Sequence, residues 1–308
     1  MASPTPVNPA DLKAIFGLEP AAAIEYLKRK GYAITWDWQE MLDSAHDRAF
    51  TVAKAMRLDV LSDIREALER ALQEGKTLKQ FIEELQPVLE RQGWWGRQVL
   101  VDGDGNAELV QLGSPYRLKT IYQTNLQSAY MAGRKAAMEE SADTHPYWRY
   151  VAIMDGKTRP SHAALNGVVY RHDDPVWSSI YPPNGFNCRC RVTAISESGM
   201  KRRGLTAQSS AGHVQQETVE TGVNKRTGEI RTADVTVVKT GRGRSFRTDP
   251  GFNHSPGTHG GIGLVAADQG AAVGCLGGDR SGQAPGGDLQ HLSRPGPGQL
   301  AAIGRDLR

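Results

Sequence analysis

The residues best suited to chemistry in this chain are two cysteines and a histidine. Cys188 and Cys190 are separated by one residue, and His162 precedes them in the same stretch. Two thiolates and an imidazole are ligands that suit zinc. His172 and Asp155 are the candidates for a fourth ligand. A zinc site formed by His162, Cys188 and Cys190 is therefore one hypothesis for this stretch.

A packing role for the same residues is the alternative, and it is the one that we favour from the sequence. Side chains two positions apart on a strand share a face, so Cys188 and Cys190 are expected to point the same way. A disulfide between such close neighbours would be strained. We therefore expect two small buried side chains, His162 hydrogen-bonding across the loop, and no bound cofactor.

A metal-dependent nuclease is a further interpretation of this stretch. It would use His162, Asn187 and the edge formed by the two cysteines. The sequence offers no general base at an ordered spacing beside a pair of metal-binding histidines. Asp173 and Asp174 are adjacent in a predicted extended loop, where neighbouring side chains point apart. We therefore expect no catalytic residue, and keep a DNA- or nucleotide-processing enzyme or toxin-like domain as the alternative.

The backbone around these residues is strongly constrained. Pro182 and Pro183 each fix φ and remove a hydrogen-bond donor, and the residue before them is pushed toward extended geometry. Gly167 follows a short helical phrase, where a left-handed position favours glycine. Gly185 is expected to let the chain turn into the Cys-Arg-Cys strand. Residues 155–191 are therefore predicted to form a loop held in one shape.

Three arginines in this stretch are expected to lock the loop through ion pairs. They are Arg159, Arg189 and Arg191, and their candidate partners are Asp155, Asp173 and Asp174. The guanidinium group can bind a carboxylate in a bidentate geometry that lysine cannot match. Contact with phosphate groups is the alternative, and we favour the structural role.

Apolar periodicity predicts the elements that must position the stretch. Recurrence at three and four residues indicates helices at residues 20–30, 38–56, 60–72 and 78–89, the last with a kink at Pro87, and a long helix from Ser114 to about Glu140. Branched and aromatic residues predict strands at 147–154, 168–170 and 190–195, and alternation predicts hairpins at 98–112 and 217–238. Thr77 and Gln80 have the form of a capping box.

These patterns predict an α+β fold. We expect an N-terminal helical block (1–96), a central α+β core with a small sheet, the long helix and the Pro/Cys-rich loop (97–197), and a basic β-hairpin extension (198–259). Residues 260–308 are rich in glycine, alanine, proline and arginine and lack periodicity. We expect a disordered tail there, and a shifted reading frame of GC-rich DNA is the alternative.

Composition excludes several classes of protein. With a mean hydropathy of −0.47 and no apolar run near the roughly 20 residues of a membrane helix, no membrane partner is expected. The start lacks the pattern of a secretion signal, and three cysteines make no disulfide framework, so we expect synthesis in the cytoplasm. Residues 198–247 hold ten Lys or Arg against four Asp or Glu. Nucleic acid or an acidic protein could bind this patch, and a solvated basic segment is the alternative.

The order of the motifs resembles the phage Mu F-like minor head proteins, the head morphogenesis family. The core pattern is D-x-x-T-R-x-x-H-x-x-L-x-G-x-V, then D-D, then PP-x-x-x-N-C-R-C. Residues 93–96 and 122–125 support it upstream, and residues 249–257 support it downstream, so the resemblance covers about 10–259. The signature residues, read as structural, are Asp155, Arg159, His162, Gly167, Asp174, Pro182, Pro183, Asn187, Cys188, Arg189 and Cys190.

The resemblance implies a non-enzymatic minor head protein of a phage or prophage. The implied partners are the portal protein and other head proteins, with phage DNA as a secondary partner. The implied location is the interior of the virion head, and the implied task is assembly or genome delivery. The helical block and the basic hairpin are the docking surfaces that we expect.

Overall fold

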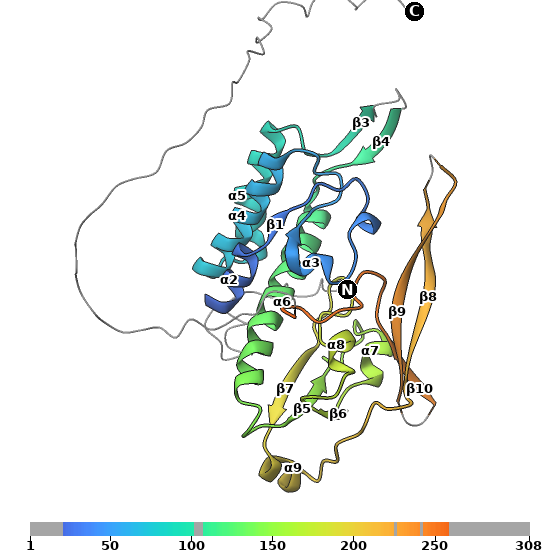
Figure 1. The fold of residues 1–308 in the computed structure, drawn as a ribbon. Helices are drawn as coiled ribbons and strands as arrows, with labels where there is room; N and C mark the ends of the chain where they lie inside the picture. Colours follow the sequence, from blue (N-terminus) through green and yellow to red (C-terminus); the bar gives the residue numbers. More distant parts are fainter. Residues whose placement is uncertain (1–20, 102–106, 225–226, 241–242, 259–308) are drawn as a thin grey trace, which may run out of the picture. The chain divides into compact units, whose positions relative to one another are not determined.

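Helices alternate with small sheets along the chain, as Figure 1 shows. The computed structural model of the 308 residues describes residues 21–101, 107–224, 227–240 and 243–258. The α+β prediction is confirmed. The tail expected from residue 260, and the predicted glycine-rich turn at 102–106, lie outside the described residues.

The segment after the first helix differs from its prediction. Helix α2 (Ala21–Lys28) forms as expected, but the helix predicted over 38–56 is wrong. The segment holds only a short 3-10 helix, η1 (Trp38–Glu40), and α3 (Ala45–Arg48), while strand β1 (Gly31–Tyr32) pairs in parallel with β2 (Ala49–Phe50). Asp43 and Lys54 have positive φ, which a continuous helix does not tolerate. Tertiary pairing therefore overrides the helical periodicity here.

Two longer helices follow as predicted. Helix α4 (Leu58–Glu74) ends at Gly75, which has a left-handed φ of 69°. Helix α5 (Leu78–Arg91) begins with the predicted capping box, because the Thr77 hydroxyl accepts from the Gln80 N–H and the Gln80 side chain accepts from the Thr77 N–H. The helix continues through Pro87. Its buried side chains are Leu78, Phe81, Leu85 and Leu89.

The long helix α6 (Pro115–Glu140) lies against the central sheet, as expected. Strand β5 (Tyr147–Val151) pairs antiparallel with β6 (Val169–Arg171) on one side and with β7 (Arg191–Ile195) on the other. Two side chains of α6 bind backbone carbonyls at this sheet: Gln127 donates to Cys190 O at 2.8 Å and Arg134 donates to Val192 O at 2.6 Å. Three short helices that connect or follow these strands are α7 (Pro160–Ala164), α8 (Trp177–Ile180) and α9 (Glu197–Arg203).

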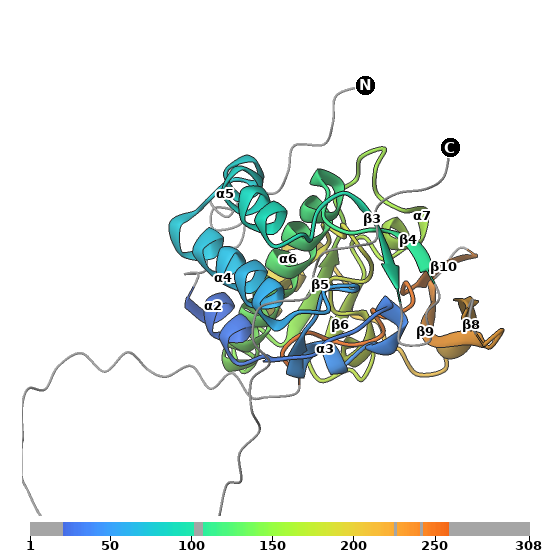
Figure 2. The same cartoon turned by 90° about the horizontal axis from the view of Figure 1, so that it is seen from above.

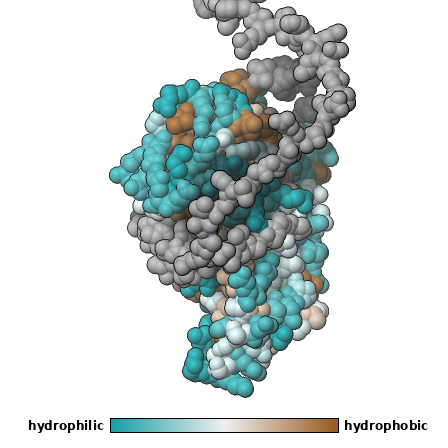
Figure 3. Space-filling model, turned by 60° about the vertical axis from the view of Figure 1, so that its left-hand side comes forward, coloured by the Kyte–Doolittle hydropathy of each residue, from teal (hydrophilic) through white to brown (hydrophobic). Residues whose placement is uncertain are grey.

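The helices stack on the other side of α6. Seen from above, α4 and α5 lie side by side next to α6, with β5 beyond it (Figure 2). Small residues allow the closest approach: a Cβ at Gly133 would lie 3.0 Å from Ala22 Cβ of α2. One continuous apolar core runs from these helices to the sheet. The face in Figure 3 is mostly hydrophilic, with isolated hydrophobic patches.

Both predicted hairpins form, and the second gains a strand that the sequence did not reveal. Strands β3 (Arg97–Val101) and β4 (Ala107–Gln111) pair antiparallel, as do β8 (Val214–Val223) and β9 (Ile230–Thr240). The unexpected strand β10 (Arg244–Arg247) pairs with β9. Its Phe246 is fully buried, with its ring centroid 6.1 Å from that of Tyr150 and 5.6 Å from that of His162. Contacts therefore cross the predicted border at residue 198.

None of the helices within the described ranges combines the length and the hydropathy that a bilayer crossing requires.

The burial of Phe246 generates a prediction for stability. Phe246→Ala should lower the free energy of unfolding by about 3–5 kcal/mol, because it removes a buried ring and leaves a cavity. Val223→Ala, on the exposed end of β8, should change it by less than about 0.5 kcal/mol. Denaturant unfolding followed by circular dichroism would measure both. Equal values for the two variants would show that β10 does not join the core.

Candidate functional site

The two cysteines and the histidine singled out by the sequence meet in the interior. His162 comes from α7, and Cys188 and Cys190 lie just before β7. The Nδ1 atom of His162 is 3.6 Å from Cys188 Sγ and 3.8 Å from Cys190 Sγ, and the three ligand atoms all lie within 4.8 Å of one another. Both cysteines are free thiols. These residues have the chemistry and the proximity to bind a metal ion.

The pKa values of the two buried thiols are shifted in opposite directions. The Cys190 thiol and the imidazole lower the pKa of Cys188 well below its usual value by hydrogen-bonding to its thiolate. The neighbouring Cys188 and burial together raise the pKa of Cys190, because two thiolates so close repel each other. The pair therefore favours one thiolate when no cation is present.

Neither proposed fourth ligand joins the cluster. His172 lies against Trp148, with ring centroids 6.3 Å apart, and Asp155 is on the surface. Asp155 instead accepts two hydrogen bonds from Arg189, at 2.8 and 2.7 Å, which confirms the predicted bidentate pair. The Arg189 guanidinium holds the pKa of Asp155 well below its usual range. Within the described residues the cluster has three members.

The other predicted ion pairs are different in the structure. Arg159 pairs with Asp249 at 3.0 Å, and Asp173 pairs with Arg171 at 3.0 Å. Asp174 binds hydroxyl and amide groups: it accepts from Val176 N–H, Ser210 N–H and the Ser210 hydroxyl. Asp174 therefore holds the loop in place, as expected. It does so by accepting hydrogen bonds from uncharged groups and not through an ion pair with arginine.

The proline-rich loop is part of the interior. Tyr181, Pro182, Pro183, Asn184 and Gly185 are all buried, and the Pro182–Pro183 peptide bond is cis. The Asn184 amide donates to the Tyr150 hydroxyl at 3.0 Å and to Ile180 O at 2.9 Å. Sequence reasoning missed Asn184, although an amide next to two prolines and a glycine is a signal for a residue that must satisfy a buried turn.

Glycine is required at two positions of this stretch for different reasons. Gly167 has the expected positive φ, at 87°. We expected the backbone freedom of glycine to be needed for the turn at Gly185. Gly185 is not among the glycines with positive φ, so the reason for glycine is different. A Cβ at Gly185 would lie 2.1 Å from Asp249 Oδ2, so close approach excludes a side chain. The left-handed residue is Asn187, with φ 59°, and it is exposed.

A segment from the end of the described chain closes over this loop. Asp249 N–H donates to Asn184 O at 3.0 Å. The same segment binds the N-terminal region, because Asp43 accepts from Asn253 N–H at 2.8 Å and Asp47 accepts from Gly257 N–H at 3.2 Å. The downstream motif at 249–257 is therefore bonded to residues about 210 positions earlier in the chain.

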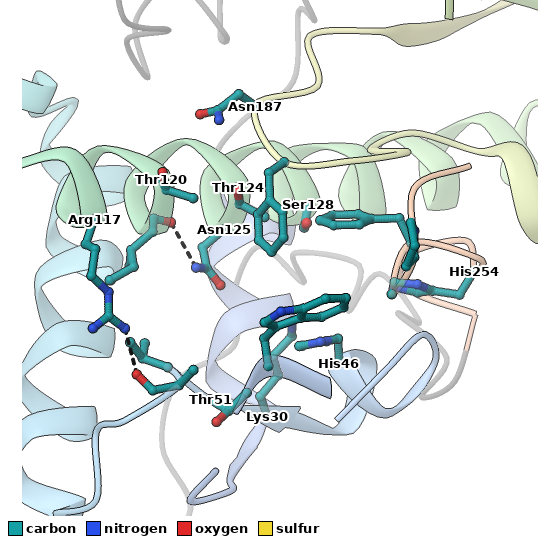
Figure 4. A pocket seen from close by; sticks show the side chains of 18 of the residues that line it. Lys30, His46, Thr51, Arg117, Thr120, Thr124, Asn125, Ser128, Asn187 and His254 are labelled. Atoms are coloured by element: carbon teal, nitrogen blue, oxygen red, sulfur yellow. Dashed lines mark hydrogen bonds between the residues drawn. The ribbon is translucent and has the colours of Figure 1, made fainter. Parts of the chain in front are cut away.

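A cavity of about 350 Å³ opens where four separate stretches meet (Figure 4). One wall is a face of α6 that carries Arg117, Thr120, Thr124 and Ser128. The other walls come from the N-terminal segment, from Phe186 and Asn187 of the loop, and from residues 250–254 of the closing segment. Three of these stretches contain motifs that the sequence analysis singled out, at residues 122–125, 155–191 and 249–257. Nothing in the sequence indicated that they share a cavity.

Several basic side chains line this cavity. Burial lowers the pKa of Lys30 to about 8, although Asp47 opposes this shift. Burial, Lys30 and His254 lower the pKa of His46 to about 4, with Asp47 again acting in the opposite direction. Arg117 is already engaged, because it donates to the carbonyls of Gln111, Leu112 and Ala53. Burial therefore disfavours the charged forms of Lys30 and His46 in this cavity.

The chain is similar to a known family and to two of its named members. The family described as "Phage Mu protein F like protein" matches residues 62–193. "Putative capsid assembly protein F" of Escherichia phage Mu is 48% identical over 253 residues, which cover 82% of this chain and 57% of that protein. "Mu-like prophage FluMu F protein" of Haemophilus influenzae is 47% identical over 225 residues, which cover 73% of this chain and 53% of that protein.

The chain thus spans about half the length of these two relatives. No solved structure was found that matches it.

The close contact at Gly185 predicts the effect of a single methyl group. Gly185→Ala should destabilise the protein by about 1–3 kcal/mol, because the new Cβ overlaps the Asp249 carboxylate and forces the loop away from the closing segment. Gly156→Ala is the matched control, since nothing lies within 4 Å of a Cβ there. Thermal unfolding measures both, and a neutral Gly185→Ala would contradict the packing described.

The lowered pKa of His46 predicts a pH dependence of stability. Between pH 6.5 and about 4 the unfolded chain binds the proton at this site and the folded chain does not, so stability falls as the pH falls through that window. The loss from His46 should reach roughly 2–3 kcal/mol, and His46→Gln should remove that part of the slope. Denaturant unfolding at several pH values measures it. The exposed His145, changed to Gln, should leave the slope unaltered.

Proposed function

This chain belongs to the Phage Mu protein F like family, and from that premise we propose that it is a minor head protein that acts in phage head morphogenesis. The printed names of its relatives, a capsid assembly protein and a prophage F protein, support this role. Its partners are then other head proteins, and we place it at the portal, inside the precursor shell.

The observation that carries the proposal is a pair of exposed apolar sites on two hairpins (Figure 1). Val99 of β3 lies directly opposite Leu109 of β4, and each is 62% exposed. Val223 of β8 lies opposite Ile230 of β9, and they are 57% and 54% exposed. Cross-strand apolar pairs normally face a core. Their exposure at both sites suits a chain that completes its packing against another protein.

The signature loop supports the non-enzymatic part of the proposal. His162, Cys188 and Cys190 are only 2%, 6% and 2% exposed, so a substrate does not reach them. The loop residues 181–185 are equally buried. A buried cluster stabilises a shape, and the surface available for docking lies elsewhere, on the hairpins and on the exposed faces of α4 and α5.

Phage DNA is a secondary partner in this proposal. Helix α9 ends with the exposed residues Lys201, Arg202 and Arg203, which extend the basic character of the segment after the central sheet. Lysine and arginine side chains on one short helix attract phosphate groups without reading sequence. Such binding would weaken steeply with added salt.

Co-expression with the neighbouring portal gene tests the proposal. The portal protein should co-purify with the tagged wild-type chain, and the double variant Val99→Asp with Leu109→Asp should recover about tenfold less of it, because charges replace the apolar pair at the contact. Met154→Asp is the matched control, since Met154 is equally exposed, at 64%, but lies outside the hairpins. Circular dichroism checks that each variant is folded.

Two results would contradict the proposal. Failure of the wild-type chain to retain the portal protein would remove the portal assignment, and equal recovery by the hairpin variant would exclude this docking surface. Cleavage of labelled DNA in the presence of a divalent metal, lost in His162→Ala, would show an enzyme instead.

A further inference from the structure

The distances within the cysteine–histidine cluster match those of a metal site. In a tetrahedral zinc site with Zn–S bonds of about 2.3 Å and Zn–N bonds of about 2.0–2.1 Å, the ligand sulfur and nitrogen atoms lie roughly 3.6 Å apart. The two Sγ···Nδ1 distances here are 3.6 and 3.8 Å. The three side chains are therefore arranged as zinc ligands are.

The backbone that carries the two sulfur atoms is held in place. Gln127 of α6 donates to Cys190 O at 2.8 Å, and the Cys188 N–H donates to Gly185 O at 3.1 Å. Groups that hold a ligand in position support metal binding. The two cysteines are therefore fixed with both Sγ atoms next to His162 Nδ1.

The imidazole makes only weak polar contacts among the described residues. Its Nδ1 atom faces the two sulfur atoms, and its buried Nε2 atom has no hydrogen-bond partner there. The ring also packs against Phe246. Because S–H groups are weak donors, the two thiols satisfy Nδ1 poorly. A cation between Nδ1 and the two Sγ atoms would satisfy these three atoms together.

We propose that His162, Cys188 and Cys190 bind one zinc ion, with Nδ1 of the histidine and both Sγ atoms as ligands. The sequence favoured a packing role for these residues, and the tertiary arrangement favours the metal. The described residues supply three of the four ligands that a zinc ion normally takes.

The ion would fasten three parts of the fold at one point. It would join α7, the end of the proline-rich loop and the start of β7, next to Phe246 of β10. Structural zinc contributes folding free energy directly. The site would therefore stabilise the loop without catalysing a reaction, since its ligands are buried.

Elemental analysis of the full-length chain, purified without chelator, tests this proposal. We expect about one zinc per chain in the wild type and close to none in Cys188→Ser, Cys190→Ser and His162→Ala. His172→Ala is the matched control and should keep the zinc, because His172 lies against Trp148 and away from the cluster.

A second measurement on the unaltered chain keeps the test independent of variant folding. After removal of the metal, added Co²⁺ should produce thiolate-to-cobalt charge-transfer absorption and the visible bands of a tetrahedral site, and Zn²⁺ should displace it. The metal-free chain should also unfold at a lower temperature. A wild-type chain that contains no zinc, gives no cobalt–thiolate absorption and unfolds at the same temperature with or without chelator would overturn the proposal, whatever the portal experiment shows.

Discussion

The contact between Asp249 and the proline-rich loop is the constraint on which the rest of the structure depends. Its N–H binds Asn184 O at 3.0 Å, and its carboxylate pairs with Arg159 at 3.0 Å while it packs against Gly185. Burial raises the pKa of this carboxyl group, and Arg159 opposes that shift. One residue thus joins the loop, α7 and the closing segment, and its contacts constrain the conformation of the loop.

Neighbouring contacts extend this constraint through the fold. Phe246, just before Asp249, fills the space between Tyr150 and His162. After Asp249, the segment bonds to Asp43 and Asp47, and Lys135 of α6 donates to Thr258 at 3.0 Å. The N-terminal region, the long helix and the sheet are therefore held by a segment that is remote from all of them in sequence. The cysteine–histidine cluster lies under this closure, where a metal ion would reinforce it.

Burial of the loop changes where a partner can bind. The constrained residues 181–185 are all buried, whereas the next two residues, Phe186 and Asn187, are exposed. Both line the cavity formed with α6 and the closing segment. Our proposal therefore places docking on the apolar pairs of the hairpins, which the described chain leaves exposed.

Local patterns in the sequence were sufficient for the elements whose stability is local. The stripes of α4 and α5, the Thr77 capping box and the proline start of α6 all depend on residues close in sequence. Tertiary structure decided the rest: the broken helix at 38–56, the burial of Phe246 on β10, the role of Gly185, the partners of Arg159 and Arg189, and the assembly of the cysteine–histidine cluster. Each depends on a contact between residues far apart in the chain, and neither periodicity nor spacing carries information about such a contact.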